Sequence, residues 1–488
     1  MAVSPIQRAR AAGSMRAVFA HVLCAPPVLD IVVGLLIVVA VPLAIATVPN
    51  TISVVSDLLP PGMSEVGTMR AHGLALPAML LTVPLAVLAH RRLHPAPILI
   101  TGMAVLAATE IAGGYASSLL TVGILRVLQG FGAGLLVPAT LVAAWQRPEG
   151  RRRTLLALWA GMLAASLLTA QALALWPLDQ ATTWRVALRP YPLVAGLGVA
   201  IAGVHLVLWL LAGEARSVPR APKTERSRLL PTCALAGGIS ALALGITFDW
   251  PPELVIVAAC VSVIALLGLG SFGTYEGPAG RTLAFTMIVL GLVVLPTTAQ
   301  LTYVELGGVG GPGLRGLWLP FVLASLIGVG AAWLAGRLPT ELVPSLTRVG
   351  LVALVAGLCA VRFLVPSADG FILVIPFGLI AGGGAVALAA AMRSASVGAA
   401  LFALTLCFPA VLTGFLLGTG MQITRLRAVQ ESENPTAQDL VDGFIGALHA
   451  WALLGGFAVV VTIALGTLLG RRRPPSVPAV SAGGQMGE

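Results

Sequence analysis

Long apolar runs recur along the whole 488-residue chain, and their length most constrains what it can fold into. A helix needs roughly 20 apolar residues to cross about 30 Å of hydrocarbon. An open sheet cannot satisfy its backbone hydrogen bonds in lipid, so the runs are expected to be helical. We predict an all-α membrane protein with 14 transmembrane helices, at 28–50, 67–89, 97–115, 119–145, 154–176, 190–213, 230–248, 253–272, 282–304, 316–336, 348–366, 370–392, 396–421 and 444–470.

The composition supports lipid as the solvent, because 58% of the residues are hydrophobic and only 10% are charged. A soluble protein is nearer 25% charged. The net charge of +10 could suggest a nucleic-acid partner, but the basic residues cluster in short loops between apolar runs. This favours a topological role, and we expect no nucleic acid. The five cysteines form no CxxC pair, so neither a disulfide framework nor a zinc site is supported. We expect no metal and no cofactor.

The basic residues are distributed unequally between the two sets of loops. One set, with both termini, carries 21 of the 29 Lys and Arg residues, and the alternate loops carry five. We call the corresponding ends of the helices the arginine-rich and the arginine-poor end. The positive-inside rule puts the arginine-rich end in the cytoplasm. We therefore predict a multi-pass protein of the cell inner (plasma) membrane with both termini cytoplasmic, which agrees with an even number of spans.

The longest stretch on the arginine-rich side, 214–229, separates six spans from the others. We predict a cytoplasmic segment at 1–27, a six-helix bundle at 28–213, a cytoplasmic linker at 214–229, two additional spans at 230–272, a second six-helix bundle at 281–470 and a cytoplasmic tail at 471–488.

The fourth span contains RVLQGFGAG, with Arg126, Gln129, Gly130, Gly132 and Gly134. This pattern resembles the span-4 motif RxxQGxGxA of the major facilitator superfamily. The following PATLVAAWQRPEGRRRT resembles that superfamily's exit from span 4 and its basic loop. The glycines permit close approach of neighbouring helices, or bending during transport.

Further stretches resemble the 14-span branch of that superfamily, the drug:proton antiporters. They are the WR pair at 184–185, QLTYVELGGVGGPGLRGLWLP at 300–320, AGRLP at 335–339 and SVGAALFALTLCFPAVLTGFLLG at 396–418. The resemblance implies two six-helix bundles around a central cavity, with two extra helices beside them. It also implies alternating access and proton-driven export of a small hydrophobic or amphiphilic molecule, with Gln171 and Gln300 as cavity candidates.

Three stretches depart from the branch. Its first inner-loop motif, GxLADRxGR, is replaced by VLAHRRLHP at 87–95. Ala40 stands where span 1 usually carries an acid, and the span-5 motif GPxxGG is missing around Gln171. All three departures concern proton coupling and leave the fold intact.

Ionisable groups within spans are costly and mark functional candidates. Arg126 is a candidate for proton coupling or for shaping the cavity; alternatively it reaches the outer interface or pins a neighbouring helix. Glu110 is a candidate proton carrier, or the partner of Arg126 in a static ion pair between spans 3 and 4. Arg70 and His72 would suit an anionic or amphiphilic substrate near the cavity mouth, or lie at the outer interface.

Asp30 could bind a proton or cation, or lie at the inner headgroup level beside the basic loops. We find no catalytic motif and expect no enzyme. Two alternatives to drug export stay open. One is a translocase of lipids or cell-envelope precursors with the same fold. The other is a non-transporting scaffold that binds partners through the 422–443 loop or the 214–229 linker. A monomer among membrane lipids is expected in each case.

Overall fold

The computed structural model describes residues 26–212, 223–246, 250–272, 277–306, 312–367, 370–431 and 436–471. Within these ranges the chain is helical, with no β-strand. The α-helices are α2 (Pro26–Ala46), α3 (Glu65–His72), α4 (Ala75–Ala89), α5 (Pro95–Gly113), α6 (Leu119–Trp145), α7 (Glu149–Leu175), α8 (Pro192–Ala212), α9 (Lys223–Ile246), α10 (Pro252–Phe272), α11 (Gly277–Leu306), α12 (Gly313–Arg337), α13 (Val343–Leu364), α14 (Val374–Ser394), α15 (Val397–Gln430) and α16 (Ala437–Arg471). Short 3₁₀ helices join some of them: η1 (Ile52–Leu58), η2 (Trp176–Leu178), η3 (Trp184–Leu188), η4 (Thr340–Leu342) and η5 (Phe371–Leu373).

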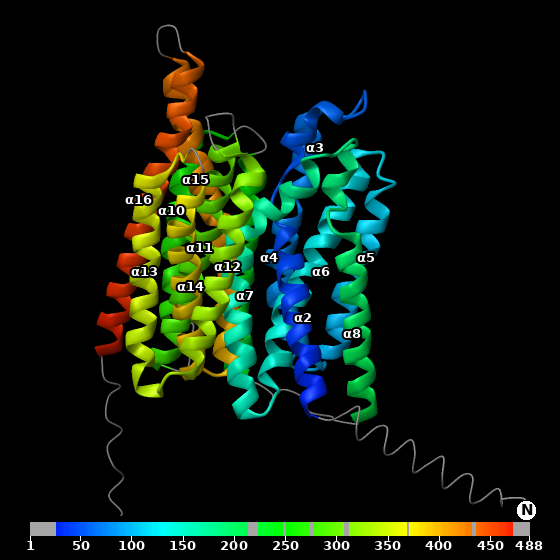
Figure 1. Ribbon diagram of the computed structural model, residues 1–488, viewed down its shortest axis with the longest axis vertical. Helices are drawn as coiled ribbons and strands as arrows, with labels where there is room; N and C mark the ends of the chain where they lie inside the picture. Colours follow the sequence, from blue (N-terminus) through cyan, green and yellow to red (C-terminus); the bar gives the residue numbers. More distant parts are fainter. Residues whose placement is uncertain are drawn as a thin grey trace, which may run out of the picture.

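The all-α, multi-span fold predicted from the sequence is confirmed. Among the described residues, 13 helical segments are long and apolar enough to cross a membrane. The predicted span at 230–248 is covered by α9, whose apolar part, Leu229–Gly245, is shorter than the others. The chain runs up and down, so that α2 begins and α16 ends at the same, arginine-rich end (Figure 1).

The span predicted as one helix at 67–89 is divided into α3 and α4 around Gly73. Side chains from other segments bind the last carbonyl groups of α3. Asn50 Nδ2 donates to Met69 O (2.8 Å), and Arg126 Nε donates to His72 O (2.7 Å). Gly73 lowers the local helix propensity, but the contacts that stabilise the break come from residues distant in the sequence.

The helices form two sets, α2 to α8 on one side and α11 to α16 on the other (Figure 1). The third and fourth long helices of each set meet through glycines. A Cβ atom on Gly132 would lie 3.0 Å from Gly102 O, and one on Gly383 would lie 2.5 Å from Gly350 O. The same close α5–α6 contact is thus repeated between α13 and α14. Helix α9 contacts α4 and α15, and α10 contacts α11 and α15, so the two extra helices lie beside the boundary between the sets.

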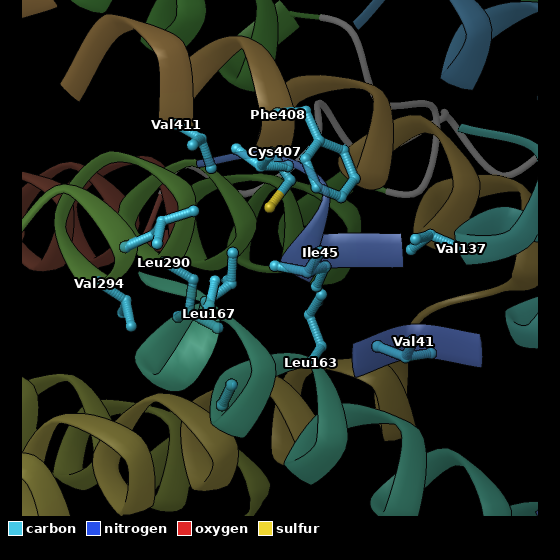
Figure 2. Packing of buried hydrophobic residues seen from close by; sticks show 14 of the residues in the cluster. Val41, Ile45, Val137, Leu163, Leu167, Leu290, Val294, Cys407, Phe408 and Val411 are labelled. Atoms are coloured by element: carbon cyan, nitrogen blue, oxygen red, sulfur yellow. The ribbon is translucent and has the colours of Figure 1, made fainter. Parts of the chain in front are cut away.

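The boundary between the two sets is formed mainly by α7 against α11, α12 and α14, and by α4 against α15. Its centre is filled by apolar side chains from α2, α6, α7, α11 and α15 (Figure 2). They include Val41, Ile45, Val137, Leu163, Leu167, Leu290, Val294, Cys407, Phe408 and Val411. Helices α7, α11 and α15 are almost wholly buried, whereas α8, α10 and α16 expose most of their surface, as helices facing lipid would.

The polar stretch 422–443, predicted as a loop, is largely helical. Helix α15 continues to Gln430 and α16 starts at Ala437, and the two project beyond the other helices at the arginine-poor end (Figure 1). Thr436 and Asp439 cap α16 reciprocally: Thr436 Oγ1 accepts from Asp439 N (3.2 Å), and Asp439 Oδ2 accepts from Thr436 N (2.9 Å). This arrangement is a capping box, and its T-x-x-D spacing is visible in the sequence.

Candidate functional site

Arg126 lies on α6 near the arginine-poor end, and its side chain is buried. Its guanidinium donates four hydrogen bonds. Nε binds His72 O (2.7 Å), Nη1 binds Gln129 Oε1 (2.9 Å), and Nη2 binds both Thr47 O (2.6 Å) and Pro49 O (3.2 Å). Arg126 therefore ties α6 to the chain leaving α2 and to the end of α3.

The acceptors explain how a buried cation is tolerated there without a carboxylate. Thr47 and Pro49 directly follow α2, and His72 is the last residue of α3. Carbonyl groups at helix C-termini have no intrahelical partner, and the helix dipole makes that end partially negative. Two helix C-termini thus face one guanidinium. This supports the interpretation that Arg126 pins neighbouring helices within its own bundle.

The network extends from Gln129 and His72 to η3. Gln129 Nε2 donates to Leu188 O (2.9 Å), and His72 Nε2 lies 3.4 Å from Ala187 O, for which it is the donor. The remaining ring nitrogen of His72, Nδ1, is buried without a hydrogen-bond partner. The His72 ring is therefore enclosed by its own helix set. The cavity-mouth and outer-interface positions predicted for it both stay predictions. Arg70, on the same helix, is half-buried.

Glu110 does not pair with Arg126, contrary to the predicted ion pair. Its Oε2 accepts from the backbone N–H of Tyr191 (3.2 Å), just before α8, and Tyr191 Oη donates to Leu173 O on α7 (2.6 Å). Glu110 is buried, and its bond joins α5 to the start of α8. The short loop between spans 3 and 4 made Arg126 the expected partner of Glu110. The carbonyl groups at two helix C-termini bind that guanidinium instead.

Asp30 lies at the other, arginine-rich end. Its Oδ1 accepts from Arg147 Nε (2.6 Å), and its Oδ2 forms a second ion pair with Arg151. Asp30 thus joins the start of α2 to Arg147 in the loop after α6 and to Arg151 in the first turn of α7, beside the basic residues as one of the two alternatives predicted.

The three motif glycines of α6 are required by close packing. A Cβ atom on Gly130 would lie 2.0 Å from Ala75 O, and one on Gly134 would lie 2.6 Å from Thr82 Cβ; both neighbours belong to α4. Gly132 faces α5 instead, as described above. Of the two alternatives predicted for these glycines, the contacts support close approach of neighbouring helices rather than bending during transport.

Gln171 and Gln300 are both buried, on α7 and α11 respectively. Gln171 Nε2 and Gln300 Oε1 have no hydrogen-bond partner. Tyr303, which the sequence analysis did not select, lies beside Gln171 and donates through Oη to Asn50 O (3.3 Å). Because α11 belongs to the second set of helices, Tyr303 and Asn50 join the two sets near the arginine-poor end.

Glu305, at the end of α11, is a second buried carboxyl group, and the sequence analysis missed it. Its Oε1 accepts from Ser367 N (3.1 Å), while its Oε2 is buried without a partner. The predicted span ended at 304, one residue earlier, so Glu305 was treated as part of a loop. A carboxyl group on a central helix with one free oxygen is able to bind a proton.

The VLAHRRLHP stretch forms the turn between α4 and α5. His94 caps α5, accepting from Ala96 N at Nδ1 (3.2 Å), and its ring stacks on Trp209 of α8 at 4.8 Å between centroids. His90 is buried, and neither ring nitrogen has a hydrogen-bond partner. Burial, with a smaller contribution from His94, lowers the pKa of His90 to about 4. Among the described residues, no three His, Cys, Asp or Glu side chains gather as a metal site.

The chain is similar to solved transporter structures. A proton:xylose symporter, XylE, bound to 6-bromo-6-deoxy-D-glucose, matches with a TM-score of 0.56 and 12% identity, covering 91% of this chain and 95% of that one. XylE from E. coli in a partially occluded inward-open conformation matches at 0.52 and 11%, covering 90% and 97%. This chain therefore has the same overall fold as these transporters of the major facilitator superfamily. An auto-inhibited peptide transporter of the POT family has the same fold, with a TM-score of 0.55 and 15% identity over 91% of this chain and 97% of that one. No family model and no curated protein matches the sequence.

Proposed function

We propose that the protein is a secondary active transporter that works by alternating access. The observation that best supports this proposal is the structure of the boundary between the two helix sets. Its centre is apolar (Figure 2). Near the arginine-poor end, the polar links across it are weak: Tyr303 to Asn50 (3.3 Å) and Arg315 to Asp179 (3.4 Å). Each set is held internally by closer glycine contacts, and the first set is also held by the Arg126 network. The two sets can therefore separate at one end as units.

An apolar centre favours a hydrophobic or amphiphilic substrate, because opening it would expose aliphatic side chains that such a molecule can cover. We propose export from the cytoplasm, with lipids included among the amphiphilic substrates. Protons are the proposed coupling ion, with Glu110 and Glu305 as candidate carriers. We expect the protein to act as a monomer in the cell membrane, with its arginine-rich end in the cytoplasm.

A disulfide across the boundary tests alternating access. A Cβ atom on Gly336 of α12 would lie 3.0 Å from Ala157 Cβ of α7, a little under the roughly 3.8 Å found in disulfides. After replacement of the native cysteines, we would introduce Ala157→Cys with Gly336→Cys. The matched control, Ala71→Cys with Gly123→Cys, joins α3 and α6 within one set, where the Cβ separation is 3.9 Å.

The readout is cellular accumulation of a lipophilic cation dye and, separately, of a short-chain fluorescent lipid, each with and without a protonophore. Oxidation should abolish export in the cross-boundary variant, and a reductant should restore it, while the control variant stays active. Equal accumulation of both probes in wild-type and empty-vector cells would refute transport of these classes and favour the scaffold alternative. Surface labelling of Gln438→Cys by an impermeant maleimide, but not of Arg92→Cys, would support the orientation.

A further inference from the structure

A second site lies at the arginine-rich end, away from the apolar centre. It is a cavity of about 210 Å³ between the start of α7 and the ends of α12 and α14, so it spans both helix sets. Leu156, Ala157 and Ala389 line its apolar part. Its volume is below the roughly 300–1,000 Å³ of pockets for drug-sized molecules. A small headgroup or anion would fill it, whereas a typical organic substrate would not.

The cavity has a strongly basic rim. Arg152 and Arg153 of α7 and Arg393 of α14 all line it, with Glu149 as the only acidic lining residue. Glu149 lies 3.6 Å from Arg152 in the same helix turn, and its side chain is 74% exposed, so it leaves the cavity positive.

Arg153, which is exposed, and Arg393, which is half-buried, belong to different helix sets but line the same cavity, and their like charges repel. Arg393 Nη1 donates to Ala335 O (3.0 Å), a neutral acceptor. Within the described part of the chain, Arg153 forms no ion pair. Two like charges that line one cavity from opposite sides of the boundary weaken the contact between the sets, and an anion between them would reverse this effect.

Two helix N-termini also favour an anion in this cavity. Glu149 begins α7, and Ser396, which also lines the cavity, caps α15 by accepting from Ala399 N (3.3 Å). The positive ends of both helix dipoles therefore border the cavity. Arginine forks and helix N-termini together match the oxygens of a phosphate group.

We propose that this cavity binds a phosphate-bearing anion, whose oxygens bridge Arg153 of one helix set and Arg393 of the other. The anion holds the arginine-rich ends of the two sets together. The apolar lining of the cavity and its place at the ends of membrane-spanning helices suit a lipid phosphate. A free phosphate compound presents the same phosphate group to the arginines. Binding requires no transport activity, so the proposal stands independently of the proposed function.

The test measures binding to the purified full-length protein by thermal shift and by native mass spectrometry. The lipid probes are phosphatidylglycerol and cardiolipin, with phosphatidylcholine for comparison, and the free probe is pyrophosphate. The variants are Arg153→Gln and Arg393→Gln. Arg92→Gln is the matched control, because Arg92 is exposed at the same end and does not line the cavity.

At least one anionic probe should stabilise wild type and Arg92→Gln, and its affinity should fall roughly tenfold in Arg153→Gln, as loss of a charge-assisted hydrogen bond predicts. Without any probe, Arg153→Gln should be at least as stable as wild type, because it removes the repulsion. Stabilisation by anionic lipids alone assigns the cavity to a lipid headgroup, and stabilisation by pyrophosphate to a free anion. Equal binding by Arg153→Gln and Arg92→Gln, or no binding by wild type, would overturn the proposal.

Discussion

Replacing Arg126 by methionine should destabilise the protein by an amount that the structure allows us to work out. The substitution keeps an unbranched side chain but removes four hydrogen bonds. At about 0.6 kcal/mol for each hydrogen bond in a membrane protein, the loss is about 2.4 kcal/mol. Three of the acceptors are backbone carbonyls of buried residues, and leaving them unpaired adds roughly 1 kcal/mol or more apiece. These losses sum to about 5 kcal/mol or more, and relief of the desolvation penalty of the buried charge offsets several kcal/mol of them. We expect a net loss of about 2–4 kcal/mol.

The assay is an SDS titration of the protein in mixed micelles, followed by the fluorescence of its nine tryptophans. Arg425→Met is the control, since Arg425 is exposed on the projecting part of α15. Arg126→Lys retains the charge but presents a single ammonium, which cannot reach all the segments that the guanidinium joins. It should recover only part of the stability. The reasoning is wrong if Arg126→Met unfolds at the same SDS fraction as Arg425→Met, or if lysine restores full stability.

Three further predictions follow from individual contacts. Gly291→Ala should destabilise the protein by about 1–3 kcal/mol, because its Cβ would lie 2.1 Å from Cys407 O of α15. Gly330→Ala should be near neutral, because a Cβ there would have nothing within 4 Å. Equal unfolding curves for the two variants would contradict this. Asp30→Asn should destabilise the protein by about 1–3 kcal/mol, because the side chains of its ion pair with Arg147 are only 11–14% exposed. Asp179→Asn should destabilise it by less than about 1 kcal/mol, because the side chains of its pair with Arg315 are 37–72% exposed. The reverse order in the same titration would refute this ranking. The pKa of His90 is lowered from 6.5 to about 4, so the unfolded chain binds one more proton between these values and stability falls as pH drops through that window, by up to about 3 kcal/mol. His90→Asn should reduce the pH dependence of unfolding between pH 7 and 4, and an unchanged slope would count against this role.

The candidate site illustrates where sequence reasoning succeeded and where it stopped. The RVLQGFGAG pattern located a buried arginine and three close-packed glycines, because a charge and small residues in an apolar run are rare enough to be visible. Proximity along the chain, in contrast, predicted the wrong partner for Arg126. Glu110 was the nearest acid along the chain, but α2 and α3 end beside the guanidinium, and their free carbonyls bind it instead.

Glu305 and Tyr303 were missed for a related reason. Glu305 stands just past the predicted span at 282–304, where a boundary error of one residue decides whether a polar group is assigned to a span or to a loop. Tyr303 stands just inside the end of that span. Their hydrogen-bond partners are Ser367 and Asn50, which lie 62 and 253 residues away in the chain. No local pattern contains that information.

The sequence by itself determined the fold class, the up-and-down path and the unequal charge of the two ends, because hydrocarbon imposes a minimum length and a low charge on every crossing. The tertiary structure decided which helices meet. It brought Arg153 and Arg393 together, turned two helix C-termini towards Arg126 and filled the boundary with apolar side chains. These outcomes depend on contacts between residues far apart in the chain, whereas the constraint imposed by lipid acts on each helix separately.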